Sequence, residues 1–104
     1  MVWIFTCLVI VSISSNNQLS ELPDDLNLPN LKVIVLNDNK FISYPSALKQ
    51  HNKIEEIYLY GNQITELPAH TFKNQLNLNG LYLSRNPLGH VPSCLERSSR
   101  ILMN

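Results

Sequence analysis

Histidine and cysteine are the first residues in this sequence to consider for chemistry. The three histidines, His51, His70 and His90, share no spacing typical of metal ligands. His90 and Cys94 are four residues apart, but a zinc site would need further ligands, and the sequence supplies no second pair with suitable spacing. We therefore expect solvated surface histidines and a buried free thiol at Cys94 rather than a metal centre.

The carboxylates offer no better catalytic candidates. Glu55 and Glu56 are adjacent, and consecutive side chains of a strand point to opposite faces, so the two would not share a substrate. The segment 37–39 (Asn-Asp-Asn) resembles the start of a calcium loop but lacks its glycine and terminal glutamate. The sequence also lacks a glycine-rich phosphate loop and a nucleophile elbow. We predict a protein that is not an enzyme, with no catalytic residue, no metal and no cofactor.

Composition narrows the class of partner. The chain has 104 residues, enough for one domain, and its eight Lys+Arg balance its eight Asp+Glu. A net charge of zero removes the electrostatic basis for binding nucleic acid or an acidic membrane surface. Leucine (17) and asparagine (13) are over-represented. Leucine builds cores and asparagine favours turns, so this combination indicates a repeat whose turns each close on a small part of the core.

A period of 22–24 residues organises the chain. Three units read L-x-x-L-x-L-x-x-N-x-L-x-x-L-P, and the apolar-proline step recurs at Pro23, Pro45, Pro68 and Pro92. The x-L-x-L-x part alternates with period two, which predicts a strand with one buried face. The asparagine ends the strand, where its amide can both donate to and accept from backbone groups of a buried turn. We predict a ladder of Asn16, Asn39, Asn62 and Asn86.

This pattern resembles the leucine-rich repeat family, and its repeat length resembles the subclass common in extracellular animal receptors and adhesion proteins. The resemblance implies an α/β fold: a right-handed solenoid of three to four repeats. Short parallel strands would line the concave face, and the return segments would be irregular, 3-10 or helical. It implies a single domain, 1–104, with repeats at about 8–30, 31–53, 54–77 and 78–95 and a tail or cap at 96–104.

The two ends depart from that subclass. Asn86-Pro87-Leu88 is similar to the start of its cysteine-rich C-terminal cap, but His90 stands where the first cysteine of the cap is expected. No cysteine-rich cap precedes the repeats either, and a disulfide between Cys7 and Cys94 stays open.

Residues 1–14 have two interpretations. The apolar run 2–13, which overlaps a small-x-small site at 12–14, is typical of a cleaved signal peptide, although no positive charge precedes it. Alternatively, Leu8, Val11 and Ile13 are core positions of a first strand, with one extra residue after Asn16.

Residues between the core positions point out of the predicted concave face, and three of the four tyrosines gather there. Tyrosine is enriched at protein interfaces, although strands also favour aromatic residues for packing alone. We predict a partner-binding face made of Val33, Val35, Asn37, Glu56, Tyr58, Tyr60, Tyr82, Ser84 and Arg85.

The sequence therefore predicts a non-catalytic module that binds a protein ligand, without nucleic acid or small-molecule cofactor. The repeat subclass and the possible signal favour a secreted, receptor-like or cell-surface protein. The missing cysteine caps favour a cytoplasmic scaffold or adaptor. A structural unit that self-associates edge to edge is a third interpretation, because no repeat follows the last predicted strand, 80–84. The tail could instead cover that edge through Leu95, Ile101 and Leu102.

Overall fold

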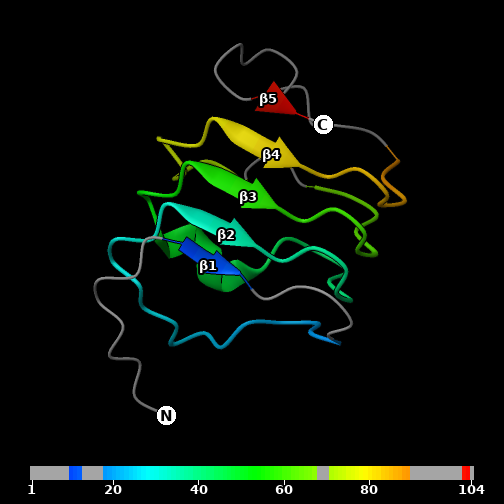
Figure 1. Ribbon diagram of the computed structural model, residues 1–104, viewed down its shortest axis with the longest axis horizontal. Helices are drawn as coiled ribbons and strands as arrows, with labels where there is room; N and C mark the ends of the chain where they lie inside the picture. Colours follow the sequence, from blue (N-terminus) through cyan, green and yellow to red (C-terminus); the bar gives the residue numbers. More distant parts are fainter. Residues whose placement is uncertain (1–9, 13–17, 68–70, 90–101, 104) are drawn as a thin grey trace.

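Five short strands form one sheet in the order of the sequence. The computed structural model describes residues 10–12, 18–67, 71–89 and 102–103. The strands are β1 (Ile10–Ser12), β2 (Val33–Val35), β3 (Glu56–Tyr58), β4 (Gly80–Tyr82) and β5 (Leu102–Met103). Every neighbouring pair is parallel, and Figure 1 shows the arrows stacked side by side and pointing the same way. The predicted solenoid of short parallel strands is confirmed.

Pairing between strands follows the repeat period. Two rows cross the sheet: Ile10, Val33, Glu56, Gly80 and Ser12, Val35, Tyr58, Tyr82. The middle residues of β2, β3 and β4 point the other way and are at most 1% exposed. The period-two alternation therefore separates a core side from an outward side, as the sequence predicts.

The return segments close the core behind the sheet. In the second repeat, Pro45 precedes the 3-10 helix η1 (Ser46–Gln50), and η1 buries Ala47 and Leu48. The ring of Tyr44 meets that of Phe72 edge-on, with 4.8 Å between centroids. Aromatic and aliphatic side chains from successive repeats thus fill one continuous core.

The asparagine ladder lies at the turn after each strand. Asn62 Nδ2 donates to the carbonyl oxygens of Leu36 (3.0 Å) and Leu59 (2.9 Å), and Asn62 Oδ1 accepts from the Phe41 N–H (3.1 Å). One buried amide therefore satisfies its own turn, the end of the preceding strand and the start of the preceding return segment.

The next repeat uses the same geometry. Asn86 Nδ2 donates to the carbonyls of Leu59 (2.8 Å) and Leu83 (3.0 Å), and Asn86 Oδ1 accepts from the Ile64 N–H (3.0 Å). Asn39 occupies the equivalent position and donates to the Leu36 carbonyl at 3.1 Å. Asn16, the first predicted member, lies outside the described residues.

The residue before each of these asparagines adopts a left-handed backbone. The φ angles are 59° at Asp38, 76° at Gly61 and 62° at Arg85. Only glycine adopts this conformation without a steric penalty, so two of the three turns hold a side chain there at some cost.

The first described repeat contains one extra residue. Ile10 pairs with Val33, an offset of 23 residues. Farther along, the Leu19 N–H donates to Asn39 Oδ1 (3.4 Å), and the Phe41 N–H donates to Asn62 Oδ1 in the same way. Leu19 and Phe41 are therefore equivalent positions, and they are only 22 residues apart. The extra residue therefore lies between Ser12 and Leu19, and the predicted place directly after Asn16 adjoins residues 13–17, which lie outside the described residues.

The C-terminal edge differs from the sequence prediction in two ways. The last repeat strand ends at Tyr82 rather than Ser84. The edge of β4 is also not open, because β5 pairs with it in parallel, with Gly80 opposite Leu102 and Leu81 opposite Met103. The backbone of Leu102 and Met103 thus extends the sheet by one strand beyond β4.

Candidate functional site

The predicted partner-binding residues share the side of the sheet opposite the core. Val33, Val35, Glu56, Tyr58 and Tyr82 belong to adjacent strands and are half-buried. The others follow the strands: Asn37, Tyr60 and Ser84 are half-buried and Arg85 is exposed. We call these nine residues the concave face.

Two tyrosines stack at the centre of this face. Tyr58 and Tyr82 occupy equivalent positions on β3 and β4, and their rings are 4.3 Å apart with 12° between planes. Neighbouring parallel strands are about 4.8 Å apart, so side chains in register naturally stack face to face. The Tyr58 hydroxyl donates to Glu56 Oε1 at 2.8 Å. This hydrogen bond is the main cause that raises the pKa of Tyr58 to about 12.

Gly80 makes room for this arrangement and was not among the predicted site residues. A Cβ at Gly80 would lie 3.1 Å from both Cε2 and Oη of Tyr82 and 3.3 Å from Cγ of Glu56. The Tyr82 ring therefore lies over Gly80, with its hydroxyl near Glu56. The available sequence signal was a glycine in the row that holds Val33 and Glu56 in the preceding repeats.

A second contact lies at the carboxyl ends of the strands. The Arg85 guanidinium lies over the Tyr60 ring, 5.6 Å from its centroid, which is cation–π geometry. Asn37 Oδ1 accepts the Tyr60 backbone N–H at 2.9 Å. Asn37 thus ties two repeats together while lying on the concave face.

The expectation of a solvated His51 is wrong. His51 is only 5% exposed, and its two ring nitrogens have fixed partners. Nε2 accepts the Leu28 N–H (3.1 Å), so the proton is on Nδ1, which donates to the Ala47 carbonyl (2.8 Å). Burial lowers the pKa of His51 below its ordinary value of 6.5 and outweighs the opposing hydrogen bond to Ala47. The imidazole is a neutral structural bridge.

We expect this bridge to make the fold sensitive to acid. A proton on Nε2 would replace the acceptor that Leu28 N–H needs with a second donor. The pKa of His51 is near 6.5 in the unfolded chain and lower in the folded chain. The contribution of neutral His51 to stability is therefore complete above pH 6.5 and falls as the pH drops further. Urea unfolding at a series of pH values checks this. Between pH 7 and 5, the free energy of unfolding should depend less on pH in His51→Gln than in the wild type. An unchanged pH dependence in that variant contradicts the assignment.

A buried polar network extends from His51 and was not anticipated. Gln75 Nε2 donates to the His51 carbonyl (2.9 Å), and Gln75 Oε1 accepts from the Tyr44 hydroxyl (2.6 Å). Gln75 is 1% exposed. The sequence did contain a signal. Three residues before the first core position of each aligned repeat stand Leu28, His51 and Gln75, so polar residues occupy a position that is leucine in one repeat.

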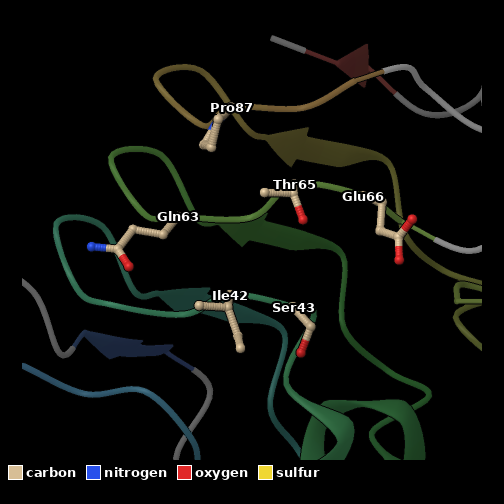
Figure 2. A pocket seen from close by; sticks show the side chains of 6 residues that line it. All are labelled: Ile42, Ser43, Gln63, Thr65, Glu66 and Pro87. Carbon is tan, nitrogen blue, oxygen red and sulfur yellow. The ribbon is translucent and has the colours of Figure 1, made fainter.

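A groove on the flank of the solenoid is a separate feature. It encloses about 590 Å³ beside the segments that follow the strands. Figure 2 shows side chains from three successive repeats around it: Ile42, Ser43, Gln63, Thr65, Glu66 and Pro87. Ile42 is 65% exposed, and Glu66 is the one charged residue of the lining. This composition suits surface contact rather than catalysis. The sequence signal for this groove was Ile42, an apolar residue at a position that holds Thr65 and Gly89 in the next repeats.

Among the described residues, no group of three or more His, Cys, Asp or Glu could hold a metal ion. In the same part of the chain, no helix has the length and apolar character needed to traverse a bilayer. The expectations for His70, His90, Cys7 and Cys94 concern positions outside the described residues.

The repeats agree with a known family in sequence as well as in geometry. A sequence model of the Leucine Rich Repeat family matches residues 53–75 and 77–98. The chain belongs to the leucine-rich repeat family. The matched segments of this leucine-rich repeat protein contain β3, β4 and two ladder residues, Asn62 and Asn86.

Two kinds of relative carry similar repeats. The chain is 42% identical over 91 residues to podocan-like protein 1 of Homo sapiens and 39% identical over 98 residues to that of Mus musculus. It is 32% identical over 92 residues to epiphycan of Mus musculus. The alignments cover 85%, 90% and 85% of this chain but only 18%, 17% and 28% of these relatives. The relatives are extracellular matrix proteins without enzymatic activity, which agrees with the prediction that this chain is not an enzyme.

Proposed function

We propose that this leucine-rich repeat chain is an extracellular module that binds a protein partner through its concave face. The observation that carries the proposal is the Tyr58–Tyr82 stack, half-buried on a parallel sheet. The extracellular relatives support the location. Their names specify no ligand for this chain, which spans less than a third of their length.

The stack is suited to binding because it is already ordered. Each ring is held by the other, and the Tyr58 hydroxyl is held by Glu56. Ordering a mobile side chain at an interface costs about 0.5–1.5 kcal/mol, and a preorganised ring avoids most of that cost. Tyrosine also offers a large apolar area together with a hydroxyl that can find a partner.

Removing both rings should remove binding without unfolding the chain. We expect Tyr58→Ala/Tyr82→Ala to weaken binding by roughly 100-fold or more, the loss typical of interface hot spots. The probe is a protein captured from matrix extract by the immobilised wild-type chain, then identified, purified and titrated against each variant. Ile42→Ala/Leu76→Ala removes two exposed apolar side chains elsewhere and should bind normally. Equal affinity of the tyrosine variant, with unchanged circular dichroism, would contradict the proposal.

The location has its own test. The chain expressed in secretory cells should appear in the medium, where intact mass and N-terminal sequencing define its start. A start near Ser15 indicates a cleaved signal, whereas a start at Met1 in the medium means that β1 is retained. Full-length chain that stays in the cytosol contradicts the extracellular proposal and favours a scaffold or adaptor.

A further inference from the structure

We propose that Glu56, Tyr58 and Tyr82 form a position that binds a lysine or arginine side chain of the protein partner. This inference rests on the proposed function, since it assigns a specificity to one part of the concave face. Three observations carry it: the charge of the cluster, its ordered geometry and its separation from the arginine on the same face.

The cluster carries one negative charge. Glu56 is its one acidic residue, and the Tyr58 hydroxyl donates to Glu56 Oε1 at 2.8 Å. The cross-strand neighbours of Glu56 are Val33 and Gly80, and neither carries a charge. These two cross-strand positions therefore supply no cation.

The carboxylate belongs to a half-buried side chain on the outward side of the sheet. The Tyr82 ring and the Glu56 side chain fill the place above Gly80 that a side chain would take, so Glu56 is packed on this side. The hydrogen bond from Tyr58 fixes one carboxylate oxygen, Oε1. The second oxygen can accept a charge-assisted hydrogen bond from an ammonium or guanidinium group.

Arg85, the one cationic member of the concave face, lies at the other end. It lies over Tyr60, four residues beyond Glu56 along the chain, a separation of roughly 13 Å for extended backbone. Arg85 already has an aromatic partner there, so it does not occupy the position next to Glu56. The face thus carries an anion at one end and a ring-bound cation at the other, which would also orient a charged peptide.

The test uses a small probe of defined chemistry. Acetyl-Gly-Arg-Gly-amide is titrated into isotope-labelled chain, and its neutral citrulline analogue serves as the matched control. We expect saturable shifts in the millimolar range at the amides of Glu56, Tyr58, Gly80 and Tyr82. The citrulline peptide should cause none. Added salt should weaken binding, because a half-exposed charge pair is screened.

Two variants of equal charge change decide the assignment. Glu56→Gln should weaken binding of the arginine peptide by about tenfold or more, whereas Glu55→Gln, one residue earlier, should leave it unchanged. Absence of shifts at the four amides, equal shifts with citrulline, or full binding to Glu56→Gln would each overturn the inference. If the captured protein still depends on Tyr58 and Tyr82 but not on Glu56, this inference fails and the proposed function stands. If the captured protein ignores the tyrosines, the proposed function itself fails.

Discussion

Replacing Asn62 with alanine is expected to lower the free energy of unfolding by about 2 kcal/mol or more. The side chain is 5% exposed and binds the carbonyls of Leu36 and Leu59 and the N–H of Phe41. Alanine leaves the buried Phe41 N–H without its acceptor, whereas the carbonyls of Leu36 and Leu59 each lose one donor and keep those of Asn39 and Asn86. The buried unsatisfied N–H costs roughly 1–3 kcal/mol, and each hydrogen bond lost by a carbonyl costs about 0.5–1.5 kcal/mol. Urea unfolding followed by circular dichroism measures it.

An asparagine outside the ladder serves as the control and shows whether the loss of stability depends on the ladder position or follows from removing any asparagine. Asn79 is exposed and immediately precedes β4. Asn79→Ala should change stability by less than about 0.5 kcal/mol, as expected for a surface substitution. Similar losses in the two variants would mean that the ladder contributes no more than a surface amide.

The second large effect is expected from Gln75→Leu, with a loss of roughly 2–4 kcal/mol. Leucine fits the position by size, because Leu28 occupies the equivalent place in the first repeat. The loss is therefore polar: the buried Tyr44 hydroxyl loses its acceptor and the His51 carbonyl loses the Gln75 amide donor. Thermal or urea unfolding measures the change.

A double-mutant cycle isolates the hydroxyl contribution. In a Tyr44→Phe background the hydroxyl is already absent, so Gln75→Leu should cost less than it does in the wild type. Gln63→Leu, at an exposed position of the flank groove, is the matched control and should be close to neutral. Equal costs of Gln75→Leu in both backgrounds would show that the 2.6 Å contact does not contribute to stability.

The sequence alone determined the repeat, the strands and the ladder. The leucine spacing names the core positions, and Asn39, Asn62 and Asn86 mark the turns, because every unit repeats one local pattern. The outward rows of the sheet follow directly, since equal spacing places Val35, Tyr58 and Tyr82 in register.

Only the tertiary structure decided the roles of His51, Gln75 and Gly80. The hydrogen-bond partners of these polar groups are not local: Leu28 is 23 residues from His51, His51 is 24 from Gln75 and Tyr44 is 31 from Gln75. Gly80 matters because a ring from its own strand and the Glu56 side chain from the neighbouring strand meet above it. The period establishes that the repeats stack. Which side chains of one repeat hydrogen-bond to groups of the next depends on distances that are set only when the repeats pack together.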